Sequence, residues 1–423
     1  MEVAVSYSSN SHAKFVVYNA LDFKSIACWQ ATSHFRMRHL HISLKFSCKK
    51  LKYSKMNRAL FVAINNLEQN ENAVRRNRFY RRMDAFDMPE NQFIKHFRLS
   101  KPLVRDLILR VSRHIPAPTR RSAIDVQTKV LLALNFFATG SYQLPVGSNI
   151  YLGVKQSSVS RSLAEVVEAL NQQDIFSEWV SFPRNVAELT RIRAGFFEKY
   201  NFPGVIGCID CTHVAIVPPK KDDLEYPEYL YVNRKRYHSI NVQLICDSDL
   251  KILHVNARFP GSTNDAYIWR NCAIEPLMRQ LQNNIPNSYF LLGDSGYPLR
   301  PWLLTPIQNA AAGSAEENYN MHQTRARATI ERCNGVLKMR FRCLLKHRVL
   351  HYTPEKCSKI INACVILHNM CIANNVPLMN ENDDEFDMGI IGHPLQNNVI
   401  AGNNPDLVAG RELQRRLVQN YFR

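Results

Sequence analysis

The sequence predicts an α/β protein in which a helical, helix-turn-helix-like region, residues 56–195, precedes an α/β domain, residues 196–376. Before Tyr200, apolar residues recur at the three- and four-residue spacing of helices. After Tyr200, the chain changes to short β-rich runs bounded by Pro and Gly, and a long helical pattern follows them. Residues 1–55 are predicted to be a disordered basic extension, and residues 377–423 a C-terminal tail.

Composition points to a globular protein with an anionic partner. The 423 residues include 54 Lys and Arg against 36 Asp and Glu, a net charge of +18, and 46% are hydrophobic, which is ample for buried cores. A charge of this size favours nucleic acid or an anionic surface as partner. No apolar run approaches the roughly 18 residues of a membrane span, and the N-terminus lacks a signal-peptide pattern. We expect a soluble intracellular protein.

The 11 cysteines show no zinc-finger spacing, and an odd count argues against a disulfide framework. One C-x-x-C pair, Cys208 and Cys211, lies in a strand pattern. Residues three apart on a strand point to opposite faces, so we expect the two sulfurs to diverge rather than chelate a metal. The cysteines are predicted to be reduced and mostly buried.

The N-terminal segments are interpreted in order. Residues 1–55 are either an upstream stretch added ahead of a start at Met56 or a basic arm for nuclear import or DNA contact. Residues 57–77 are compatible with a helix, and the following stretch to Arg82 is basic. A helix is predicted from Lys101 after a Ser100 cap, and another from Asp125 to Thr139 with Gly140 past its end.

Residues 151–170 have the pattern of a helix-turn-helix. A short segment at Tyr151–Val154 precedes a helix whose first turns hold Ser157, Ser158, Ser160 and Arg161. Recognition helices contact DNA near their N-terminal ends, so Ser160 and Arg161 are candidate DNA-binding residues. The alternative is an ordinary helical hairpin with an exposed polar face.

The α/β domain is predicted from alternating runs of β-branched residues and helical periods. Strands are expected at Val205–Ile209, Val214–Val217, Ile240–Cys246, Ile252–Ala257 and Tyr289–Leu292. Helices are expected at Asp265–Arg270, around Glu275–Leu281, from His322 to about Leu345, and after Thr353. The tail from Gly410 to Arg423 has the pattern of a short basic amphipathic helix.

Four acidic residues form a candidate metal site. Asp210 and Asp294 each follow an apolar run that predicts a buried strand, and Asp265 opens a predicted helix. Mg²⁺ and Mn²⁺ take oxygen ligands, and a pair of such ions can stabilise a phosphodiester displacement. Glu331 lies on the predicted long helix, where it either reaches the aspartates or pairs with basic neighbours one turn away.

Two groups of cations are candidate DNA-binding residues. Arg234, Lys235 and Arg236 are consecutive in an insert between predicted strands, where we expect them to face phosphates. Lys338 and Arg340 follow Glu331 on the long helix and are assigned to the same role.

Four segments together resemble the PIF/Harbinger transposase superfamily, and in particular its transposase-derived nucleases. They are GCIDCTHV at Gly207–Val214, PGSTND at Pro260–Asp265, LGDSGYP at Leu292–Pro298 and IERCNGVLKMRFRC at Ile330–Cys343. The resemblance spans roughly residues 84–375. At Asn334, many relatives carry an aromatic residue, which is the one departure from the family pattern.

The resemblance implies an RNase H-like DDE nuclease domain that uses Mg²⁺ or Mn²⁺. In that fold the first acid lies on strand one, the second just after strand four and the third on a later helix, which implies Asp210, Asp294 and Glu331. Asp265 is then an auxiliary metal ligand, although it is also a candidate for the second acid. The resemblance further implies a Myb/SANT-like DNA-binding partner and a location in the nucleus, with the cytoplasm as an alternative.

The expected activity is metal-dependent cleavage of DNA. Two other interpretations remain open from the residues: a catalytically silent, domesticated DNA- or chromatin-binding protein, and an active transposase encoded by a mobile element.

Overall fold

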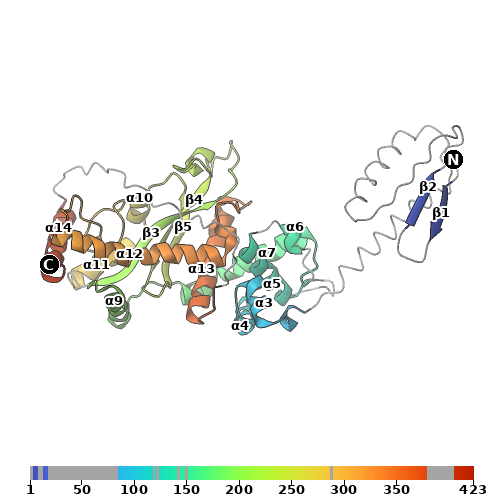
Figure 1. The fold of residues 1–423 in the computed structure, drawn as a ribbon, viewed down its shortest axis with the longest axis horizontal. Coiled ribbons are helices and arrows are strands. Elements are labelled where there is room, and N and C mark those ends of the chain that lie inside the picture. Colours follow the sequence, from blue (N-terminus) through green and yellow to red (C-terminus); the bar gives the residue numbers. More distant parts are fainter. Residues whose placement is uncertain are drawn as a thin grey trace. The chain divides into compact units, whose positions relative to one another are not determined.

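The computed structural model describes residues 3–7, 13–17, 84–117, 120, 123–140, 143–147, 151–285, 289–378 and 404–423. The chain forms two compact units, Met1–Tyr80 and Arg81–Arg423 (Figure 1). In the first unit, strands β1 (Val3–Tyr7) and β2 (Ala13–Val17) pair as an antiparallel hairpin. The remainder of residues 1–55, the helix expected at 57–77 and the basic stretch to residue 82 lie outside the described residues.

A five-stranded mixed sheet is the centre of the second unit. Its order is β5-β4-β3-β6-β7, in which β3, β4 and β5 are antiparallel and β3, β6 and β7 are parallel. The strands are β3 (Val205–Ala215), β4 (Ser239–Cys246), β5 (Ile252–Pro260), β6 (Phe290–Leu292) and β7 (Leu303–Leu304).

One strand replaces two that the sequence predicts. The run expected at Val205–Ile209 and the first two residues of the run expected at Val214–Val217 belong to the single strand β3, which ends at Ala215, so the separation between the two runs is wrong. The pairing of β3 with β4 continues from Cys208 opposite Cys246 to Ala215 opposite Ser239. Backbone hydrogen bonds therefore carry the strand through the polar residues that interrupt its apolar pattern.

Helix α12 (Ala315–Arg340) packs on β3 and β4, and Figure 1 shows it running alongside the sheet. The predicted bounds, His322 to about Leu345, are displaced. Ser314 caps the helix by accepting a hydrogen bond from the backbone N–H of Glu317, so the helix begins earlier. It ends at Arg340, and a short 3₁₀ turn, η4 (Arg342–Leu344), follows.

Other helices complete the layers around the sheet. Helix α9 (Val186–Tyr200) packs on β3, α10 (Asp265–Arg270) contacts β4, and α13 (Pro354–Ala373) packs on β5. Helix α11 (Ile274–Asn284) follows α10 in the chain. The side chain of Asn369 on α13 accepts a hydrogen bond from the backbone N–H of Ile252 and donates to its carbonyl. This pairing satisfies backbone groups at the edge strand β5.

Upstream of the sheet lies a set of helices: α3 (Glu90–Phe97), α4 (Lys101–Val111), α5 (Val126–Thr139), α6 (Gln143–Gly147), α7 (Gln156–Leu170) and α8 (Gln173–Trp179). The helix predicted at Asp125–Thr139 is confirmed as α5, which Asp125 caps and which ends at Gly140 with a φ of 60°. Helix α5 packs against α3 and α7, and α7 also contacts α13, so these helices share one compact unit with the sheet.

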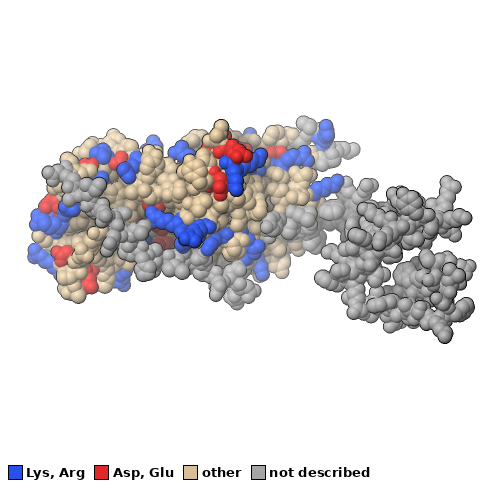
Figure 2. Space-filling model, turned by 90° about the horizontal axis from the view of Figure 1, so that it is seen from above, with Lys and Arg blue, Asp and Glu red and all other residues tan. Residues whose placement is uncertain are grey.

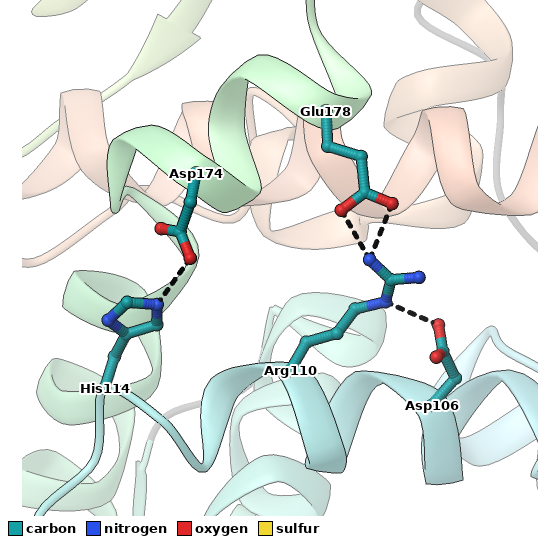
Figure 3. A network of polar contacts seen from close by, with 5 residues as sticks. All are labelled: Asp106, Arg110, His114, Asp174 and Glu178. Carbon is teal, nitrogen blue, oxygen red and sulfur yellow. Dashed lines mark hydrogen bonds and ion pairs between the residues drawn. The ribbon is translucent and has the colours of Figure 1, made fainter.

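A polar network joins α4 to α8 (Figure 3). Arg110 on α4 binds Asp106 of its own helix at 2.7 Å and the carboxylate of Glu178 on α8. His114 contacts Asp174 at 2.9 Å beside it. Exposed pairs of this kind contribute little to stability each, because water screens them, but they link α4 and His114, which follows it, to α8.

The C-terminal segment is part of the body rather than a loose tail. Helix α14 (Pro405–Tyr421) begins earlier than the predicted Gly410 and packs on α12 and β7. Phe422, 1% exposed, lies against the rings of Phe202 and Tyr319. Burial of this aromatic residue explains why the segment docks. None of the described helices is long and apolar enough to cross a membrane.

Candidate active site

The structure places Asp210 on strand β3 and Asp294 just after the neighbouring parallel strand β6. Cys208 on β3 pairs with Leu292 on β6, and each aspartate lies two residues further along its chain from that pair. Asp210 is within β3, opposite Leu244 of β4, and Asp294 follows the end of β6. Register alone therefore brings the two carboxylates to adjacent positions.

Asp265 and Glu331 come from helices beside the sheet. Asp265 is the first residue of α10, whose predicted bounds are confirmed, and Asn241 of β4 donates a hydrogen bond to its Oδ1 at 3.1 Å. Glu331 lies on α12 and forms an ion pair with Arg327 one turn earlier, at 2.7 Å. The helical pairing considered for Glu331 from sequence is thus present, in addition to its place near the aspartates.

Electrostatics show that the three aspartates form one cluster. Burial raises the pKa of Asp210 to about 8, and the charges of Asp294 and Asp265 add to this rise. The pKa of Asp294 is also raised, by burial first and then by the charges of Asp265 and Glu331. Arg327 opposes the rise in both pKa values. Like charges held this close favour protonation of one carboxyl or a bound cation.

A polar stripe on α12 faces this cluster. Arg327, Glu331, Asn334 and Lys338 are each half-buried or buried and recur at the spacing of one helix face. Asn334 donates from Nδ2 to Asp210 Oδ2 at 3.3 Å, and Lys338 donates to Thr212 Oγ1 at 2.7 Å. Sequence reasoning singled out neither Arg327 nor Asn334 for this role. Their common spacing with Glu331 was the available signal.

The donor chemistry of the cluster fits a hard divalent cation. All four acidic residues offer carboxylate oxygens, which Mg²⁺ and Mn²⁺ prefer as ligands. A bound cation would also relieve the repulsion between the carboxylates, which contributes to the raised pKa values of Asp210 and Asp294. A buried amide oxygen, Asn334 Oδ1, also lacks a hydrogen-bond partner beside Asp210. As arranged, no group of three or more His, Cys, Asp and Glu among the described residues stands at metal-holding distances.

The loop before β4 presents three exposed cations. Arg234, Lys235 and Arg236 stand at the tip of a turn that Asn233 organises by accepting a hydrogen bond from the backbone N–H of Lys235 at 2.9 Å. Burial lowers the pKa of nearby His213 to about 4; Asp265 opposes this shift, whereas Lys338, Lys235 and Arg234 reinforce it. The basic loop and the acidic cluster therefore lie within electrostatic range of the same histidine.

The remaining predicted DNA-binding residues have different surroundings. Arg340 is 5% exposed and donates to the carbonyl of Val376 at 2.7 Å, so its assignment to DNA is wrong. It lies on the buried side of α12, where its guanidinium group is hydrogen-bonded to the segment that follows α13. Lys338 is held against β3 and also donates to the carbonyl of His213. On α7, Arg161 is exposed and Ser160 is partly buried.

Both cysteines of the C-x-x-C pair behave as the strand pattern predicts. Cys208 donates to the carbonyl of Ala326 on α12, whereas Cys211 contacts the hydroxyl of Tyr297. The thiols diverge, and burial raises both of their pKa values. Every described cysteine is free, and all but Cys211 are buried.

Figure 2 shows a row of basic side chains near the middle of the described surface. The whole chain has an excess of 54 Lys and Arg over 36 Asp and Glu. A surface of this kind attracts polyanions at long range.

Comparison with known proteins defines the class. A family model described as DDE superfamily endonuclease matches residues 209–369, the segment from β3 to α13 that contains all four acids. No solved structure matches the chain.

Several curated proteins are similar over most of their length. The mouse protein named "Putative nuclease HARBI1" is 36% identical over 300 residues, 70% of this chain and 82% of its own. Its namesake from Xenopus laevis is 33% identical over 309 residues, 72% and 85% of the two chains. "Protein ALP1-like" from Arabidopsis thaliana is 26% identical over 261 residues, 59% and 61%. The chain belongs to the family of Harbinger transposase-derived nucleases, as the resemblance predicts.

Proposed function

We propose that the chain is a divalent-metal-dependent nuclease that hydrolyses phosphodiester bonds in DNA. The observation that carries this proposal is the cluster of Asp210, Asp265 and Asp294, in which burial, and then the charges of Asp294 and Asp265, raise the pKa of Asp210. Such an arrangement costs folding free energy, and strongly shifted groups of this kind concentrate at functional sites. The names of the vertebrate relatives agree with a nuclease.

We infer an RNase H-like arrangement for the sheet. Its order, with three antiparallel strands followed by two parallel ones, makes β3 the first strand of the domain and β6 the fourth. Asp210 then lies on the first strand, Asp294 just after the fourth and Glu331 on a later helix. This correspondence favours Asp294 as the second core acid and Asp265 as an auxiliary ligand.

Each residue has a role in the proposed reaction. Asp210, Asp294, Asp265 and Glu331 would hold Mg²⁺ or Mn²⁺, which supplies Lewis-acid stabilisation of the charge that develops during phosphodiester displacement. Arg327 pairs with Glu331 and limits the negative charge of the cluster. Arg327 thereby keeps the acids together.

The exposed cations position the substrate. Arg234, Lys235 and Arg236 reach solvent next to the site, where they would bind DNA phosphates and fix the direction of the strand without reading sequence. Arg161, with Ser160, would add contacts from the first turns of α7. Lys338 acts locally, because its ammonium group is bound to the β3 backbone and to Thr212.

The test is a cleavage assay on double- and single-stranded DNA with Mg²⁺, Mn²⁺ or EDTA, with E331Q as the matched variant. Cleavage by the wild type alone, abolished by chelator, supports the nuclease. A folded wild-type protein that binds DNA but does not cut it in either metal contradicts the proposal and favours a binding protein.

The family also leads us to propose that the protein acts in the nucleus with a separate Myb/SANT-like DNA-binding protein. We expect a low intrinsic sequence specificity, because the basic loop contacts would be made to phosphates, and such a protein would need a partner to select its DNA sites. Selection of binding sites from a random DNA pool measures it directly. A long, strongly enriched motif selected by this chain alone would contradict the need for such a partner.

A further inference from the structure

Asn334 differs from the other polar residues of the α12 stripe because it is almost completely buried. Its side chain is 8% exposed, whereas Glu331, one turn earlier on the same helix face, is partly open to solvent. Helix propensity gives no reason for Asn at this position, since Asn is a weak helix former. The reason must come from its contacts.

The two ends of the Asn334 amide have different surroundings. Nδ2 donates to Asp210 Oδ2 at 3.3 Å, so the amide stands directly beside the carboxylate of the first acid. Oδ1 is buried and has no hydrogen-bond partner among the described residues. An unpaired buried acceptor costs about 1–3 kcal/mol, which a purely structural residue such as Leu would avoid.

The position of this unpaired oxygen is set by the hydrogen bond of the nitrogen. Both atoms are bonded to the same carbon, so Oδ1 stays close to Asp210 as long as Nδ2 donates its hydrogen bond to Asp210. Reversing the amide would place two oxygens against each other whenever the carboxyl group is ionised, which is the form that binds a cation. Amide carbonyl oxygens are ordinary ligands of hard divalent cations, together with carboxylates.

We propose that Asn334 is a metal-site residue of this chain: its nitrogen positions Asp210, and its carbonyl oxygen is a ligand of the divalent cation held there. This inference rests on the proposed metal-dependent function. It adds a neutral oxygen to a site whose other protein ligands are all charged. A neutral ligand supports binding without adding to the repulsion between the aspartates.

The experiment measures Mn²⁺ binding to the full-length protein by isothermal titration calorimetry and by the electron paramagnetic resonance of free Mn²⁺. Four variants are compared with the wild type: N334L, N334D, D210N and T324L. Leu keeps the size of Asn without its oxygen, and Asp keeps an oxygen but loses the donor. Thr324 is exposed on the same helix and controls for introducing Leu there. Circular dichroism and melting in EDTA check that each variant is folded.

We expect N334L to bind Mn²⁺ at least about tenfold more weakly than the wild type, with T324L unchanged. N334D should bind close to the wild-type affinity, because the oxygen remains. Equal affinity of N334L and wild type overturns the inference, as does N334D binding as weakly as N334L, since the donor alone would then matter.

The control with D210N separates this inference from the proposed function. If the wild type binds Mn²⁺ and D210N does not, the metal site stands, and only the comparison of N334L with N334D decides the role of Asn334. If the wild type does not bind Mn²⁺ at all, the proposed metal-dependent function and the inference both fail.

Discussion

The acidic cluster and the basic loop are neighbours in space, but the chain builds them in opposite ways. Asp210, Asp265 and Asp294 are partly buried, and each accepts a hydrogen bond that orients its carboxylate, from Asn334, Asn241 and the backbone N–H of Gly296, respectively. The loop cations at 234–236 are exposed at the tip of a turn. This difference indicates that the role of the acids depends on a fixed geometry, whereas the role of the loop cations depends on their net charge. Each kind of substitution should therefore have its own signature.

The largest effect is expected for Asp210. Replacing it by Asn removes the central charge of the cluster, and loss of several kcal/mol of transition-state stabilisation lowers the cleavage rate about a thousandfold. DNA affinity should not fall, because the loop is unaffected. Single-turnover cleavage and fluorescence anisotropy on the same preparation measure the two quantities. A D210N protein that cuts at the wild-type rate would break the comparison.

The next effect belongs to the basic loop. The triple variant R234A/K235A/R236A should weaken DNA binding about 10-fold or more at physiological salt, and the slope of log affinity against log salt should fall by about 2–3. At saturating DNA the cleavage rate should recover. Titrations between low and high salt give the slope. An unchanged slope would mean that these cations do not contact phosphates.

The pH dependence of stability isolates the acids from the cations. The pKa of Asp210 rises from 3.8 to about 8 in the folded protein, so the folded state holds this proton more tightly. The free energy of unfolding therefore declines as pH rises between these values. In EDTA, D210N should exceed the wild type in stability by several kcal/mol at pH 8, since each unit of pKa shift corresponds to about 1.4 kcal/mol, and by almost nothing below pH 4. Urea unfolding at both pH values measures the difference; equal stabilities at pH 8 would contradict it.

The smallest effect on DNA sharpens the contrast between exposed and buried cations. R340M should leave DNA affinity unchanged, because Arg340 is 5% exposed and bonded to the Val376 carbonyl. It should lower stability by about 1–2 kcal/mol through the loss of that buried hydrogen bond. Anisotropy and thermal unfolding test the pair of outcomes. A loss of affinity in folded R340M would show that this cation reaches DNA after all.

Local rules predicted much of the fold. The bounds of α5 were predicted correctly from Asp125 and Gly140, because the groups that cap a helix lie next to its ends in the sequence. The bounds of α10 followed for the same reason. Strand β3 was divided in two because its polar residues look like a break, and only pairing with β4 shows otherwise. The docking of α14 depends on Phe422 meeting distant aromatic residues, which no local pattern contains.

The candidate site was predictable as a set of acids but not as a set of contacts. Motif order named Asp210, Asp265, Asp294 and Glu331, and the structure brings the aspartates together. The contacts of these acids were not predicted, because the sequence alone does not show whether a cation on a helix faces solvent or the core. Arg340 was assigned to DNA on that ground, whereas the helix face decides its role.

The most direct test of the central claim is to map the metal in the folded protein. Fe²⁺ replaces Mg²⁺ at the site, and with ascorbate and peroxide it cuts nearby backbone, which mass spectrometry locates. The account predicts cuts beside Asp210, Asp265 and Asp294 that excess Mg²⁺ suppresses and that D210N lacks. Cuts confined to other parts of the chain, in a protein that still cleaves DNA, would contradict it.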